Sequence, residues 1–166
     1  MENIVISLVQ IERPDKFDLN IVIGMSHFIK TVEDIYEAIA NVNPRIKFGL
    51  AFCEASGPRL IRTTGTDKNL IKLAVKNAEK IGAGHSFVLM LDETFPVNIM
   101  HSLRTVPEIV SIFCATSNPL QVIVGESEQG RGILGVIDGG TPLGVETKKD
   151  VDDRKKLLRE GLGYKT

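Results

Sequence analysis

Six glycines, three carboxylates and one arginine lie within the sixteen residues from Gly125 to Gly140. Glycine lacks a Cβ, so a ligand or a second stretch of backbone can approach it closely. Arg131 is suited to hold a phosphate group with two parallel hydrogen bonds. Glu126, Glu128 and Asp138 are suited to accept hydrogen bonds from ribose hydroxyls or to contact a metal. The segment is therefore our first candidate for a ligand site, and the alternative is a glycine-rich hairpin with solvated charges.

Two nucleotide-binding patterns nearly fit this segment. Gly130, Gly132 and Gly135 have the spacing of the dinucleotide fingerprint, but the residues after Gly132 favour a strand, whereas that fingerprint opens a helix. Gly125 and Gly130 have the spacing of a P-loop, but Arg-Gly follows where Lys-Ser or Lys-Thr is needed. We therefore expect neither a dinucleotide fold nor a P-loop.

Two of the three histidines are candidate catalytic residues. His85 follows the glycines Gly82 and Gly84 and precedes an apolar strand, where an imidazole can act as a base or accept a phosphoryl group. His27 precedes a predicted helix whose N-terminus suits an anion, and Lys30 adds a positive charge there. The alternatives are a half-buried, hydrogen-bonded histidine for His85 and a surface loop for His27. His101 is interpreted as an ordinary helix-face residue.

Composition excludes several classes of function. The net charge is −1, no basic block occurs, Trp is absent and aromatic residues make up 5%, which argues against a nucleic-acid partner. The apolar N-terminus is too short to span a membrane and carries Glu2 instead of a basic region, so we expect a cytoplasmic protein without a membrane partner. Cys53 and Cys114 lie in apolar runs and are predicted to be buried thiols, and we predict no metal site.

The order of predicted elements indicates one α/β mixed (α+β) domain over residues 1–166, with a mixed, partly antiparallel sheet and about four helices. The runs 3–12 and 19–24 read as strands that pair as a hairpin. The clearest helix is expected to begin with Thr66 as its cap and to end at Gly82. Further strands are predicted over 46–52, 59–64, 85–91, 108–115, 120–124 and 131–137, and helices from residue 31, from Pro96 and over 150–158.

Four strings of residues together resemble the adenosine-specific kinase family. They are SHFIKTVED from Ser26, FGLAFCEASG from Phe48, GAGHSF from Gly82 and EQGRGILGVIDG from Glu128. The resemblance covers nearly the whole chain. It implies a compact mixed α/β fold, binding of adenosine and AMP in preference to ADP or ATP, a histidine that carries a phosphoryl group, and a homo-oligomer, expected to be a trimer.

By this resemblance the phosphoryl-bearing residue is His85 or His27, of which we favour His85. Glu126, Glu128, Arg131, Asp138 and Lys30 are the corresponding candidates for substrate contact. The leading hypothesis is a phosphotransferase that acts on adenosine or AMP through a phosphohistidine. The alternatives are a non-catalytic adenosine/AMP-binding or sensing protein and an oligomeric scaffold without a small ligand. The sequence names neither a cofactor nor the phosphoryl donor.

Overall fold

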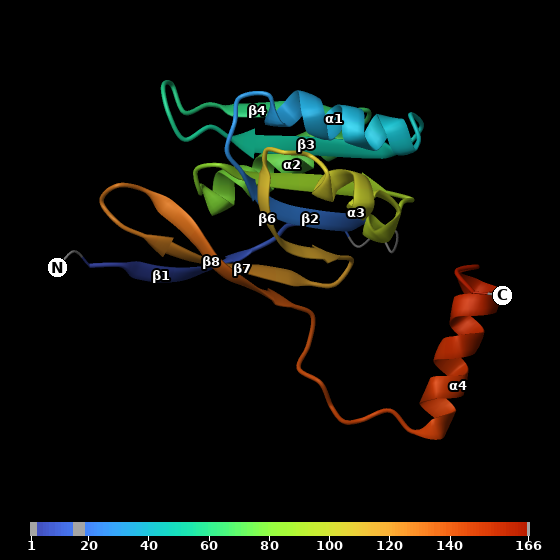
Figure 1. Ribbon diagram of the computed structural model, residues 1–166. Helices are drawn as coiled ribbons and strands as arrows, with labels where there is room; N and C mark the ends of the chain where they lie inside the picture. The colour runs from blue at the N-terminus through green and yellow to red at the C-terminus, as the bar shows by residue number, and fades with distance from the viewer. Residues whose placement is uncertain (1–2, 15–18, 166) are drawn as a thin grey trace.

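A five-stranded antiparallel sheet forms the centre of the computed structural model, which describes residues 3–14 and 19–165 (Figure 1). Each ladder between neighbouring strands is antiparallel. In spatial order the strands are β4 (Ile61–Gly65), β3 (Lys47–Cys53), β5 (Ser86–Asp92), β2 (Asn20–Ser26) and β6 (Ile109–Thr116).

One face of this sheet packs against two helices, α1 (Thr31–Val42) and α3 (Pro96–Arg104). Side chains alternate between the two faces of a strand, so every second residue of the inner strands points to these helices. In β3 these are Phe48, Leu50 and Phe52, all of them buried. The apolar faces of α1 and α3 and the alternate side chains on this face of the sheet thus form one continuous core.

The opposite face packs against helix α2 (Lys68–Ile81) and a second, three-stranded sheet. This sheet has the order β1 (Val5–Gln10), β7 (Leu120–Glu126) and β8 (Arg131–Asp138), again with antiparallel ladders. Its inner side chains, such as Val122 and Val124, share one core with Ile21 and Ile23 of β2. The second sheet therefore lies beside α2 over the same face.

The C-terminal part leaves the two sheets as an extended arm after β8 and continues into α4 (Lys148–Lys156) and a π-helical turn, η1 (Leu157–Gly161) (Figure 1). Thr147 and Asp150 cap α4 reciprocally. The end of the chain returns to α3, because the Tyr164 hydroxyl lies 3.3 Å from Asn98 Oδ1. Among the described helices, none has the length and apolar character needed to cross a membrane.

The predicted fold class is confirmed: the described residues form a single-domain α+β fold with four α-helices, and their strands form two antiparallel sheets. The predicted hairpin of the first two strands is wrong. β1 pairs with β7 at the edge of the small sheet, whereas β2 pairs with β5 and β6. The reason is burial, because β2 is covered on both faces and belongs in the middle of the large sheet.

The predicted cap of α2 is wrong by one residue. Asp67 is the cap, and its carboxylate accepts hydrogen bonds from the backbone of Asn69 and Leu70. The Thr66 hydroxyl instead accepts a hydrogen bond from the Phe48 N–H at 3.0 Å and donates one to the carbonyl of Ile46, just before β3. The predicted C-terminus is confirmed, since Gly82 has a φ of 61° and ends the helix in the left-handed region.

Candidate functional site

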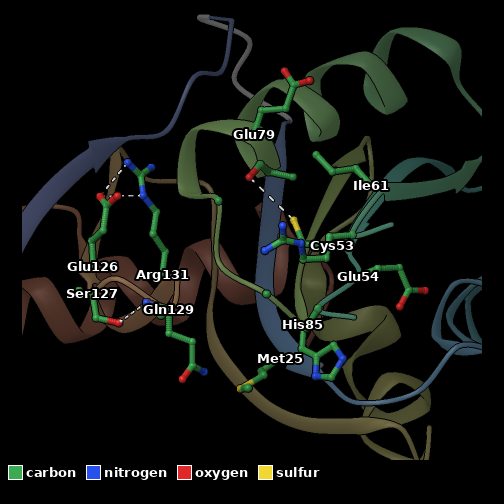
Figure 2. Close-up of a pocket in the computed structure, with 18 of the residues that line it drawn as sticks. Met25, Cys53, Glu54, Ile61, Glu79, His85, Glu126, Ser127, Gln129 and Arg131 are labelled. Carbon is green, nitrogen blue, oxygen red and sulfur yellow. Dashed lines mark hydrogen bonds and ion pairs between the residues drawn. The ribbon is translucent and has the colours of Figure 1, made fainter. Parts of the chain in front are cut away.

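A cavity of about 940 Å³ lies where the β7–β8 hairpin meets the ends of β2 and β3 and the loop after α2 (Figure 2). A cavity of this size can hold a nucleoside monophosphate. Its polar lining comes from two sides, with Glu126 and Arg131 on the hairpin and His85 and Glu54 on the large sheet. The other lining residues include Ile4, Met25, Cys53, Ala55, Pro58, Arg59, Ile61, Glu79, Gly82, Gly84, Ser127, Gln129, Gly130 and Leu134.

The backbone fixes His85 firmly at the start of β5. Its N–H donates to the Cys53 carbonyl at 2.7 Å, and its carbonyl accepts from the Ser26 N–H at 2.8 Å. The residue has a φ of 61°, a left-handed backbone conformation that residues other than glycine rarely adopt. The imidazole stacks on buried Phe52 with ring centroids 6.0 Å apart. Such local strain is often found at functional sites, where the surrounding structure maintains it.

Arg131 connects the hairpin to the loop that carries His85. Its Nε and Nη2 donate to the same Glu126 oxygen at 3.0 and 2.9 Å, and its Nη1 lies 3.4 Å from the Lys80 carbonyl. Its aliphatic part passes over Gly82, where a Cβ would lie 3.3 Å from Arg131 Cδ. A parallel bridge between Ala83 and Arg131 joins the two backbones. The guanidinium is therefore held in place while remaining partly exposed to the cavity.

Three further charged residues line the cavity, namely Glu54, Arg59 and Glu79. Glu54 is the most buried of the cavity carboxylates, with a side chain 19% exposed, and it forms a long ion pair of 3.5 Å with Arg62. Sequence reasoning did not select these residues. The signal available for Glu54 was its position directly after an apolar strand, within the string FGLAFCEASG.

The cavity also has apolar walls, among them Met25, Ile61 and Leu134. Apolar walls suit a flat base, carboxylates suit ribose hydroxyls, and a guanidinium suits a phosphate. The arrangement thus offers each part of a nucleoside monophosphate a chemically matched surface.

The remaining candidates from the sequence lie outside this lining. His27 is an exposed residue whose ring contacts Phe28, and Glu128 is exposed in the turn between β7 and β8. Asp138, at the end of β8, accepts hydrogen bonds from Thr116 at 2.7 Å and from Asn118 at 3.0 Å. The structure therefore places His85, Glu126 and Arg131 in the lining of one cavity and His27, Glu128 and Asp138 outside it.

Lys30 lies beside α1, away from the cavity lining. Its ammonium pairs with Asp34 and with the buried Glu108, both at 2.6 Å. These hydrogen bonds, first to Asp34 and then to Glu108, raise the pKa of Lys30. The lysine is thus a cation fixed by two carboxylates.

Both cysteines are free thiols; the predicted burial is confirmed for Cys53, whereas Cys114 is half-buried. Burial raises the pKa of the Cys53 thiol, and it raises the pKa of Cys114 to about 11. Thiols with such pKa values are poor nucleophiles at neutral pH. Across residues 3–14 and 19–165, His, Cys, Asp and Glu side chains form no group of three or more that is placed to hold a metal ion.

Comparison with known proteins identifies a family and a similar solved structure. The family model described as adenosine-specific kinase matches residues 9–165, nearly the whole chain. Among solved structures, the chain is similar to the PH1918 protein from Pyrococcus horikoshii OT3, with 40% sequence identity, a TM-score of 0.91 and 99% of each chain covered. No curated protein matches the chain.

Proposed function

The chain belongs to the adenosine-specific kinase family, and from this premise we propose that the cavity binds adenosine or AMP and that His85 carries a phosphoryl group during transfer to or from this ligand. The observation that carries the proposal is the meeting of His85 and Arg131 in one cavity, although they lie 46 positions apart in the sequence. We assign the protein to the cytoplasm and, from its family, expect a homo-oligomer, a trimer.

We assign the parts of the ligand to the chemistry of the walls. Arg131 receives the 5′-phosphate of AMP, because a guanidinium presents two parallel donors to phosphate oxygens. Glu126 keeps the guanidinium oriented through its paired hydrogen bonds. Glu54 and Glu79 are candidates to accept hydrogen bonds from the ribose hydroxyls, and the apolar walls cover the base.

The proposed transfer has two steps. First, the lone pair of a His85 ring nitrogen forms an N–P bond as the P–O bond of the donor breaks, and the electron pair leaves on the donor oxygen. Second, the 5′-hydroxyl of adenosine attacks the phosphorus, the N–P bond breaks, and the ring nitrogen regains its lone pair. The hydroxyl proton passes to a cavity carboxylate, and Glu54 is our candidate because its residue adjoins the Cys53 carbonyl that fixes His85.

The test exploits the acid lability of phosphohistidine. The intact mass of the protein, measured with and without mild acid treatment after incubation with a radiolabelled phosphoryl donor, reports this bond. We expect acid-labile phosphate on the wild type and on His27→Ala, and none on His85→Ala. Phosphate that persists on His85→Ala and is lost on His27→Ala would transfer the role to His27, and the absence of phosphate from all three proteins contradicts the phosphohistidine mechanism.

The second candidate function is non-catalytic binding or sensing of adenosine or AMP. It is favoured by the glycine segment, which leads into strand β8 and so does not form the phosphate-binding helix N-terminus of common kinases. This alternative predicts saturable binding by calorimetry together with no transfer of label from any donor. Transfer of label to adenosine would exclude it.

A further inference from the structure

The outer face of the three-stranded sheet is apolar and exposed in the described part of the chain. Val9 packs against the core, so the alternating residues Ile4, Ile6 and Leu8 point outward. Ile6 is 66% exposed. It pairs with Gly125, over which Leu134 lies, since a Cβ at Gly125 would be 3.2 Å from the Leu134 side chain. These residues form one exposed patch on β1, β7 and β8, which we call the outer face.

This outer face carries no charge. No Asp, Glu, Lys or Arg occurs within residues 5–10, 120–125 or 132–137, although charged residues make up 25% of the whole sequence. β1 is in addition an edge strand. Soluble proteins usually protect apolar edge strands with charged side chains or cover them, and exposed apolar patches of this kind mark interaction sites. The composition of these strands thus indicates that another surface packs on the outer face.

The arm after β8 exposes its apolar side chains in the described part of the chain. Leu143 is fully exposed and Val145 is 95% exposed, and no backbone hydrogen bond is formed within residues 140–146 as described. Figure 1 shows the arm extended away from both sheets before α4 begins. Glu146 is the first charged residue after Asp138, so residues 140–145 of the arm match the outer face in their lack of charge, and Glu146 pairs with Arg154 of its own chain.

The dimensions of the two segments agree. An extended chain of eight residues, such as 140–147, reaches roughly 26 Å. Three strands about 4.8 Å apart span roughly 10 Å, so one arm can cross the whole outer face. Residues two apart in an extended chain point to the same side, which allows Leu143 and Val145 to pack on the sheet together.

We propose that residues 140–147 of a second copy of this chain cover the outer face and thereby close the cavity. The link to the cavity is that Ile4 and Leu134 belong both to its lining and to the outer face. A copy that packs on the outer face therefore covers the open side of the site that holds Arg131. The closure of the cavity rests on the proposed adenosine binding, whereas the contact between copies does not.

The test measures molar mass first, without any ligand. By sedimentation velocity, we expect the wild type to be an oligomer of 18.2-kDa chains and Leu143→Glu and Ile6→Glu to be monomers. Leu143 is fully exposed, so its replacement leaves the fold of one chain intact, as circular dichroism will verify. Val42→Glu, an exposed apolar residue at the end of α1, is the control and should stay oligomeric. A monomeric wild type, or an oligomeric Leu143→Glu or Ile6→Glu, overturns the contact.

Adenosine affinity is measured next on the same proteins. We expect Leu143→Glu to bind adenosine at least 10-fold more weakly than the wild type and Val42→Glu to bind it equally. Unchanged affinity of the monomeric Leu143→Glu would show that the contact does not close the cavity. An oligomeric wild type that binds no adenosine would contradict the proposed function while the contact between copies stands.

Discussion

The two sheets of this protein differ in how they are covered. The five-stranded sheet lies between α1 and α3 on one face and α2 with the small sheet on the other, and the side chains of its inner strands are almost all buried. The three-stranded sheet is packed on one face and exposes apolar residues on the other. The large sheet fixes the backbone of His85, and the small sheet carries Glu126 and Arg131 of the same cavity. In our proposal the outer face of the small sheet also contacts a second copy of the chain.

The largest contrast is expected from truncating one side chain in each sheet. Leu89→Ala in β5, where the side chain is fully buried, should cost about 2–5 kcal/mol of unfolding free energy, because it leaves a cavity between helices and sheet. Ile6→Ala on the outer face should cost less than about 1 kcal/mol in the monomeric Leu143→Glu background, since Ile6 is mostly exposed there. Urea unfolding of each variant and its parent protein measures the two losses of unfolding free energy. Equal losses would contradict the difference in how the two sheets are covered.

A smaller contrast concerns two glycines. Gly49 of β3 lies directly under α2, and a Cβ there would overlap the backbone of Leu70 and Ile71. Gly49→Ala should therefore cost about 1–3 kcal/mol, because helix and sheet must separate. Gly140→Ala, after the small sheet, meets no atom within 4 Å and should change stability by less than about 0.5 kcal/mol. Thermal unfolding of the two variants measures both changes in stability. An unchanged stability of Gly49→Ala would show that α2 is not packed closely against β3.

These elements also show what the sequence could predict. The apolar spacing and the glycine at residue 82 were sufficient to predict α2 and its end, because a helix and its left-handed cap are determined by neighbours in the chain. The pairing of β1 was not predictable in this way. Val5 pairs with Glu126, more than a hundred residues away, and only the burial of β2 in the large sheet excludes the local hairpin.

The same limit applies to the candidate site. The glycine-flanked His85 and the Arg131 segment were identified from local composition, but their meeting depends on the long-range bridge at Ala83. Asp138 had the same local appearance as Glu126, and its hydrogen bonds to Thr116 and Asn118 follow from where β8 ends beside the β6–β7 turn. Glu54 was not selected from the sequence, because its place in the lining depends on how the loop after β3 lies along the cavity.

The smallest expected effect concerns the ion pairs between the end of β1 and α2. Glu12, just after β1, pairs with Lys76 and Lys80 of α2, and these hydrogen bonds lower its pKa. The folded-state pKa lies below the unfolded value, so the stabilisation is present above about pH 4.5 and is lost as the pH falls through the lower, folded pKa. Glu12→Gln should melt slightly below the wild type at pH 7, and the difference should narrow as the pH falls through the lowered pKa of Glu12. A difference in melting temperature that stays constant from pH 7 down to acid unfolding would exclude this ion pairing as its cause.

The most direct test of the central claim is calorimetric titration of adenosine and of AMP into the wild type and Arg131→Ala. A charged hydrogen-bonding contact to phosphate contributes about 1.5–3 kcal/mol, so loss of Arg131 should weaken AMP binding at least about 10-fold and leave adenosine binding within about 3-fold. Equal AMP affinity in the two proteins, or no saturable binding of either ligand to the wild type, would contradict the assignment of this cavity to adenosine and AMP.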